Sequence, residues 1–258
     1  MSHFQQEKFV EIASEYLNLN HSEKIFELGS YDVNGSIKPF FSFNEYIGVD
    51  VSEGPNVDKI YDGKNLNFLS NNYFDLSISC NCFEHNPYWK SNLVDMYRVT
   101  KEEGHLIVQI ASRGFDEHGT TRTNPELSAA SQEKGWDYYM NVTVKEFLNE
   151  SSKLDFKYHY ITYNPFSRDL YFFGKKGLKI SDKKNKEIKK EFNKLIKPCF
   201  VRHEGEKLRY LKLAWKIIFK FPFYFLMYLL PDPNYQNIRF NYGKNKKKLK
   251  RNIRSLFK

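Results

Sequence analysis

The sequence is poor in cysteine and has no apolar run of membrane-spanning length, and both shortages exclude classes of protein. Its three cysteines, Cys80, Cys82 and Cys199, lack the Cys/His spacing of a zinc site, so no metal is expected. Cys80 and Cys82 would lie too far apart on one strand to pair easily, which indicates a reducing compartment. The apolar run of residues 223–230 has eight residues, whereas a membrane-spanning helix needs about 20.

Positive charge is concentrated toward the C-terminus. The net charge is +9, and residues 177–258 carry 23 Lys and Arg against 6 Asp and Glu. We therefore divide the chain into a mildly acidic domain, residues 1–178, and a basic helical extension, residues 179–258. A partner attracted by charge would contact the extension. The first residues lack the apolar segment of a secretory signal, so we expect a cytoplasmic location.

Short apolar runs alternate with stretches of helical periodicity along the domain. Strands are expected at residues 24–29, 46–50, 57–62, 74–80, 105–111, 156–163 and 169–174, and helices at residues 4–18, 88–100, 143–149 and 180–197. This order predicts an α/β, Rossmann-like fold, with a mostly parallel seven-stranded sheet and helices on both faces. The last two strands are close enough in sequence to form an antiparallel hairpin.

Residues suited to a ligand follow the first four expected strands. In open α/β sheets, ligands bind outside the carboxyl ends of the strands. The candidates for contact with a cofactor are Glu27, Gly29, Ser30, Gly35, Asp50, Val51, Asp62, Gly63 and Asn81. Glycines permit close approach of the backbone, and a carboxylate such as Asp50 can accept hydrogen bonds from ribose hydroxyls.

The first of these turns discriminates between cofactors. Residues 29–35 read Gly-Ser-Tyr-Asp-Val-Asn-Gly, so the middle glycine of a dinucleotide-binding Gly-x-Gly-x-x-Gly turn is missing. Asp32 would also repel a pyrophosphate. S-adenosylmethionine (SAM) has no phosphate and carries a sulfonium and an ammonium, so an acidic turn suits it better.

With these motifs in order, residues 20–112 resemble the class I SAM-dependent methyltransferases. The resemblance implies SAM as cofactor and S-adenosylhomocysteine as product. It also implies that Glu27 lies near the methionine end, Asp50 binds the ribose and Asp62 lies near the adenine. The turn of residues 30–34 is longer than is usual in that family. It resembles the turn in methyltransferases of bacterial surface-polysaccharide (capsule) gene clusters.

Two histidines are candidates for a catalytic base, which an oxygen nucleophile requires. His85 follows the fourth strand, and His118 lies in the long polar segment after the fifth. The alternative for His85 is that it only begins the next helix, with Asn86 and Pro87 setting the first turn. For His118 and its neighbours the alternative is an ordinary polar loop.

The same polar segment offers candidates for acceptor binding. Arg113 and Arg122 could form an anion pocket, Tyr138 is expected to wall it, and Trp136 is expected in the core. The predicted acceptor is a small phosphorylated or sugar-linked molecule, methylated on oxygen, such as a sugar hydroxyl or a phosphoramidate-type decoration.

The extension leaves several partners open. Arg209, Lys212, Lys216 and Lys220 share one helix face. Residues 207–258 could dock on the domain or on a second copy in a homo-oligomer, contact an anionic membrane at its inner face, or bind nucleic acid. Two alternative functions follow, namely an RNA methyltransferase and a non-catalytic SAM-fold scaffold at the membrane.

Overall fold

One seven-stranded sheet organises the chain in the computed structural model, which describes residues 4–16, 19, 24–33, 35–177, 181–197, 218, 222–223 and 225–256. The strand order is β3-β2-β1-β4-β5-β7-β6. The strands are β1 (Lys24–Leu28), β2 (Glu45–Asp50), β3 (Lys59–Ile60), β4 (Phe74–Cys80), β5 (Thr100–Ala111), β6 (Phe156–Asn164) and β7 (Asp169–Lys176). β7 alone runs opposite to the other strands of the sheet, which confirms the predicted mostly parallel α/β sheet.

Helices bury both faces of this sheet, as predicted. Side chains alternate along β5, so Leu106 and Val108 face one apolar cluster and Ile107 faces the other. The first cluster holds helices α2 (Trp89–Val99) and α4 (Val144–Ser151), and the second holds α1 (Phe4–Tyr16) and α5 (Asp182–Ile196). Such two-sided burial explains why these strands read as continuous apolar runs.

Two strand boundaries differ from the prediction. Strand β3 keeps only Lys59 and Ile60, because its pairing with β2 covers just those two positions. Strand β5 begins at Thr100 rather than His105, since Thr100 pairs with Phe74 ahead of a register shift. The charged residues 101–103 hid this start from an apolar pattern.

Helix α5 belongs to the domain and not to the extension. Phe192 is fully buried, with its ring 5.4 Å from Phe173 and 4.7 Å from Tyr160, and Ile196 is buried beside it. The boundary predicted between residues 178 and 179 therefore places in the extension a helix that covers one face of the sheet. The many lysines of α5 concealed its apolar stripe.

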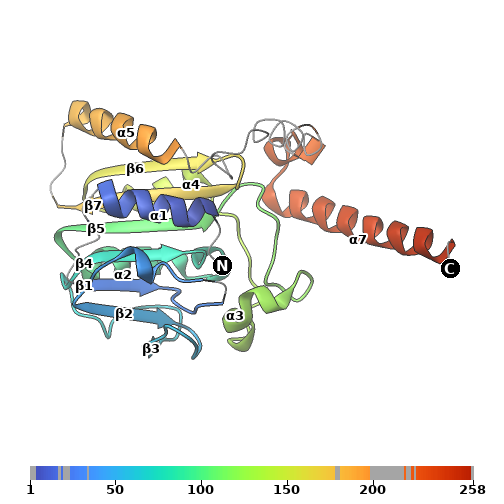
Figure 1. Ribbon diagram of the computed structural model, residues 1–258, viewed down its shortest axis with the longest axis horizontal. Coiled ribbons are helices and arrows are strands. Elements are labelled where there is room, and N and C mark those ends of the chain that lie inside the picture. Colours follow the sequence, from blue (N-terminus) through green and yellow to red (C-terminus); the bar gives the residue numbers. More distant parts are fainter. Residues whose placement is uncertain are drawn as a thin grey trace.

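Beyond the domain, helix α7 (Asp232–Leu256) runs away from the sheet, and its N-terminal part lies beside the loop that follows β5 (Figure 1). The predicted basic face of Arg209, Lys212, Lys216 and Lys220 lies outside the described residues. Among the helices that the structure describes, none combines the length and apolar character required to cross a membrane.

Replacing Phe192 with alanine should test the assignment of α5. We expect the free energy of unfolding to fall by about 3–5 kcal/mol, the usual range for a buried Phe→Ala change. Urea unfolding is the measurement, and Lys190→Ala, an exposed position of the same helix, is the control. Equal small effects for both variants would show that α5 contributes nothing to the domain.

Candidate functional site

The carboxyl ends of the parallel strands open into a cleft of about 670 Å³, counting the space open to solvent. They meet the loop carrying α3 (Ala129–Glu133) on this side of the sheet (Figure 1). We call this space the strand-end cleft. It is lined by Gly29, Tyr31, Val33, Asp50, Val51, Tyr61, Cys80, Asn81, Cys82, His85, Asn86, Trp136 and residues 127–131.

Gly29 lets the first turn close over the end of β4. Its φ is +82°, and a Cβ there would lie 2.5 Å from Cβ of Cys82. Any other residue would therefore clash as well as being strained. The amide of Gly29 donates to the carbonyl of Val49 at 2.8 Å, which joins the turn to β2. This part of the predicted cofactor turn lines the cleft.

Asp50 presents a half-buried carboxylate to the cleft. The amide of Tyr31 donates to its Oδ2 at 3.1 Å, so the carboxylate also positions the turn. Burial raises the pKa of Asp50, while hydrogen bonds from the amides of Tyr31, Val51 and Ser52 oppose that rise. Val51 and Asn81, two further candidates from the sequence, line the same cleft.

Ser30 and Gly35 do not line the cleft, because the turn folds back on itself. The amide of Gly35 donates to Oδ1 of Asp32 at 2.6 Å, and the amide of Asp32 donates to the carbonyl of Pro55 at 3.0 Å. Ser30 is buried behind the turn against Gly48. The carboxylate of Asp32 thus stabilises the turn by accepting a hydrogen bond within it.

Asp62 and Gly63 also lie away from the cleft lining. The exposed carboxylate of Asp62 accepts the amide of Lys64 at 2.8 Å, a contact that lowers its pKa. Gly63 lies under the ring of Trp136, which would be 2.0 Å from a Cβ there. Trp136, expected in the core, instead walls the cleft together with Tyr61. Trp136 lies in a polar stretch without helical or strand periodicity, so no pattern predicted its place.

Glu27 is buried one layer behind the cleft. Its carboxylate accepts a hydrogen bond from the hydroxyl of Tyr46. Burial raises the pKa of Glu27 to about 7, although the bond from Tyr46 lowers it. Glu27 therefore supports the turn from β1 and is not part of the surface that faces a ligand.

The two predicted base candidates lie side by side. Nε2 of His85 is 3.2 Å from Nε2 of His118, and both line a second space of about 770 Å³, counting its open part, the histidine cavity. Asn81, His85 and Leu127 line both this cavity and the strand-end cleft. The two spaces are therefore neighbours, and His85 lies between them.

The hydrogen bonds of the pair define its tautomers. Nδ1 of His118 lies 3.1 Å from the carbonyl oxygen of Asp116, which can only accept, so this nitrogen donates. Nε2 of His118 must then accept from Nε2 of His85. Burial lowers the pKa of His85 to about 3 and also lowers that of His118, so both rings are neutral at pH 7.

Glu84 completes a cluster of residue types that bind metals. Its carboxylate and the ring nitrogens of His85 and His118 lie within 4.8 Å of one another. Burial raises the pKa of Glu84 to about 7. Imidazole and carboxylate ligands suit several divalent metals, so this cluster could hold one, which the sequence did not predict.

The predicted anion pocket of Arg113 and Arg122 does not form. Nε of Arg113 donates to the carbonyl of Met227 at 2.8 Å. This bond joins the segment that precedes α7 to the loop after β5. Arg122 pairs with Glu117 and donates to Oδ1 of Asn237 at 2.7 Å. Neither guanidinium lines the histidine cavity.

Tyr139, rather than the predicted Tyr138, borders the histidines. Its ring centroid lies 5.5 Å from that of His85 and 5.1 Å from that of His118. Tyr138 instead places its hydroxyl 3.2 Å from the sulfur of Met140. Adjacent residues along a strand-like segment point to opposite sides, so a prediction that is wrong by one position names the ring that faces away.

Comparison with known proteins gives one family match. Residues 36–108 match a model described as a methyltransferase domain. This range runs from the end of the first turn into β5, and it supports the predicted class of enzyme and its cofactor, SAM. The search of curated proteins found no match.

Several solved structures are similar at low identity. A SAM-dependent methyltransferase from Thermotoga maritima, described as a possible histamine N-methyltransferase, is 18% identical over 66% of this chain and 89% of its own, with a TM-score of 0.45. The 1,6-didemethyltoxoflavin-N1-methyltransferase of Burkholderia thailandensis, with S-adenosylhomocysteine bound, is 13% identical over 67% and 79%, with a TM-score of 0.44. The DszA carbon methyltransferase is 14% identical over 70% and 57%, with a TM-score of 0.48.

The buried carboxyl group of Glu27 should make stability depend on pH. Its pKa is raised by folding, so its contribution is present below the unfolded value near 4.5 and is lost as pH rises through about 7. Relative to the wild type, Glu27→Gln should gain about 3 kcal/mol between pH 4.5 and 8, at about 1.4 kcal/mol per pKa unit. Urea unfolding at both pH values measures this difference. A gap that does not change with pH would contradict the assignment.

Proposed function

We propose that this chain is a SAM-dependent methyltransferase that transfers a methyl group to an oxygen of a small acceptor. The observation that carries the proposal is that the strand-end cleft and the histidine cavity are adjacent and share His85 in their linings. A donor in the first space and an acceptor in the second would meet at that residue. The family match over residues 36–108 supports the class of reaction.

The residues of the strand-end cleft fit the proposed cofactor. Asp50 would accept hydrogen bonds from ribose hydroxyls, and Gly29 lines the cleft beside it. The rings of Tyr61 and Trp136 offer flat apolar surfaces for the adenine. When bound, SAM supplies an electrophilic methyl group on a sulfonium.

His118 is the proposed base. The carbonyl of Asp116 holds its Nδ1 proton, so Nε2 carries the lone pair that would take a proton from an acceptor hydroxyl. An entering hydroxyl would replace the hydrogen bond between His85 and His118. The same carbonyl would then stabilise the imidazolium, as an orienting acceptor does in other acid–base pairs. His85 would donate from Nε2 and thereby position the acceptor.

The proposed acceptor is sugar-linked or phosphorylated. The resemblance of the first turn to that of surface-polysaccharide methyltransferases supports a sugar hydroxyl, and a place in capsule modification follows from the same resemblance. Peripheral contact of the extension with an anionic membrane also stays a proposal. Exposed Tyr228, Leu229, Ile238 and Tyr242, close in sequence to the lysines of α7, support it.

Removal of the Asp50 charge should weaken cofactor binding. Asp50→Asn is expected to raise the SAM dissociation constant about 10-fold or more, because hydrogen bonds to a charged group contribute about 1.5–3 kcal/mol. Isothermal titration calorimetry with SAM is the measurement. The matched control is Asp62→Asn, whose exposed carboxylate binds its own turn and should leave affinity within about 3-fold. Absence of SAM binding by the wild type would favour the non-catalytic scaffold.

Substitution of the two histidines should separate base from positioning residue. With an acceptor found by screening labelled SAM against nucleotide-sugars, phosphorylated small molecules and RNA, His118→Gln should lower kcat about 10²–10⁴-fold. SAM affinity should not change. Because burial lowers both pKa values, the wild-type rate should not fall near pH 6.5, where an exposed histidine is protonated.

Two results would contradict this role. Full activity in His118→Gln together with complete loss in His85→Gln would make His85 the base. Loss of wild-type activity on dialysis against EDTA, with recovery on adding a divalent metal, would assign Glu84, His85 and His118 to a metal site instead.

A further inference from the structure

A second opening adjoins the histidine cavity, between residues 116–124 and residues 236–247 of α7. It encloses about 1200 Å³, counting its open part, and we call it the basic groove. Asp116, Glu117 and Asn124 line both the groove and the histidine cavity. An acceptor with its reactive hydroxyl at His118 could therefore continue into the groove.

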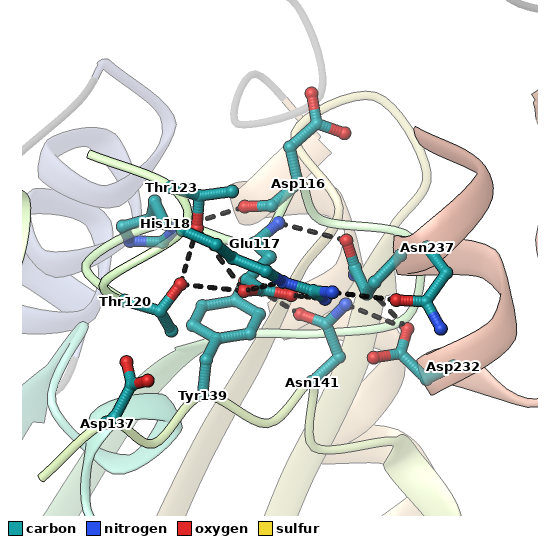
Figure 2. A network of polar contacts seen from close by, with 12 residues as sticks. Asp116, Glu117, His118, Thr120, Thr123, Asp137, Tyr139, Asn141, Asp232 and Asn237 are labelled. Atoms are coloured by element: carbon teal, nitrogen blue, oxygen red, sulfur yellow. Dashed lines mark hydrogen bonds and ion pairs between the residues drawn. The ribbon is translucent and has the colours of Figure 1, made fainter. Parts of the chain in front are cut away.

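The acidic residues of the basic groove are already paired. Asp116 bonds to Arg239 of α7, and Oδ1 of Asp116 lies 2.8 Å from Nη1 of Arg168. Glu117 bonds to Arg122, and its Oε1 also accepts from Thr120 at 2.7 Å. Figure 2 shows Glu117 at the centre of this network, with Asn237 of α7 beside it. These carboxylates therefore hold arginines in place along the groove.

Two further cations line the groove beside these arginines. Lys244 and Lys247 line it, and no ion pair joins either of them to another residue in the described part of the chain. They are one helical turn apart, so their side chains reach the same region of space. The groove thus presents positive charge that the domain does not neutralise.

The shape of the groove leaves space beside these lysines. Phe240, Gly243 and Lys247 recur at three or four residues and so share one face of α7. A Cβ at Gly243 would meet nothing within 4 Å, so the groove is open there. Phe240 adds a flat apolar surface, with the guanidinium of Arg122 5.4 Å from its centroid.

We propose that the basic groove binds a diphosphate group of the acceptor while the methylated end occupies the histidine cavity. This inference rests on the proposed function and names its substrate class. Lys244 and Lys247 supply two adjacent positive charges for two adjacent phosphates, and Arg239 and Arg122 border them. The anion site is thus on α7, and the domain alone does not contain it.

Binding of inorganic pyrophosphate tests the groove without SAM or methyl transfer. At low ionic strength, Lys244→Glu with Lys247→Glu should weaken pyrophosphate binding at least 10-fold in calorimetry on the full chain. The matched control, Lys246→Glu with Lys248→Glu, changes the same charge on the same helix outside the groove and should change affinity less than 3-fold. Equal losses in the two pairs would overturn the proposal, since they would indicate a non-specific basic helix.

Gly243→Leu fills the groove without altering charge. We expect pyrophosphate binding to weaken and SAM affinity to stay unchanged. With a diphosphate-linked acceptor that the enzyme methylates, such as UDP-glucose, we expect a raised KM at similar kcat. Asn245→Leu, an exposed position outside the groove, is the control and should match the wild type. Wild-type pyrophosphate affinity in Gly243→Leu would overturn the proposal even if SAM binding and methyl transfer were intact.

Vesicles distinguish a soluble diphosphate from a membrane surface. Flotation with vesicles of phosphatidylglycerol and phosphatidylcholine should be affected equally by the two lysine pairs, because a surface attracts all lysines of α7 alike. Vesicle binding that depends on Lys244 and Lys247 alone, without pyrophosphate binding, would assign the groove to lipid and overturn the proposal.

Discussion

The carboxylate of Asp116 joins three segments that are distant in sequence. It bonds to Arg168, in the turn between β6 and β7, and to Arg239 of α7, while its own loop follows β5. Arg168 is buried, and it also donates to the carbonyl of Gly114 at 2.5 Å. A buried guanidinium without such partners would be strongly destabilising, so this ion pair fixes where the loop must lie. The carbonyl of the same Asp116 then sets the tautomer of His118.

Much of the sheet could be predicted because its information is local. Apolar runs ending in Gly or Asp mark the strands of a doubly covered sheet, and the Asp50 carboxylate is placed by strand order alone. The extent of β3 and the beginning of β5 were not predicted correctly, because pairing with a neighbouring strand, and not apolar character, determines them. Helix α5 was misassigned for a related reason, because two buried residues, Phe192 and Ile196, position a helix that is otherwise polar.

The site was less predictable than the sheet, because its walls depend on the path of the loop after β5. Trp136 reaches across to Gly63, and Tyr139 rather than Tyr138 reaches the histidines. Arg113 and Arg122 were correctly placed in this loop, yet both bond to the C-terminal segment or to the loop itself. No periodicity in the sequence records contacts between segments more than 100 residues apart. The pairing of His85 with His118 follows from the same fold of the loop and could be proposed only as two separate candidates.

Leu127 gives the two spaces a shared wall, and this has a thermodynamic consequence. The segment that begins at Leu127 covers the strand-end cleft, and Leu127 itself also lines the histidine cavity. Gly119, where a Cβ would lie 2.4 Å from Cβ of Ser128 and 2.9 Å from Cε1 of His85, keeps that wall tight against the histidine. A ligand that displaced Leu127 would change the lining of both spaces, and so the affinity of the neighbouring one. Linkage requires the effect to be reciprocal, so the occupants of the two spaces would be cooperative with equal coupling in both directions.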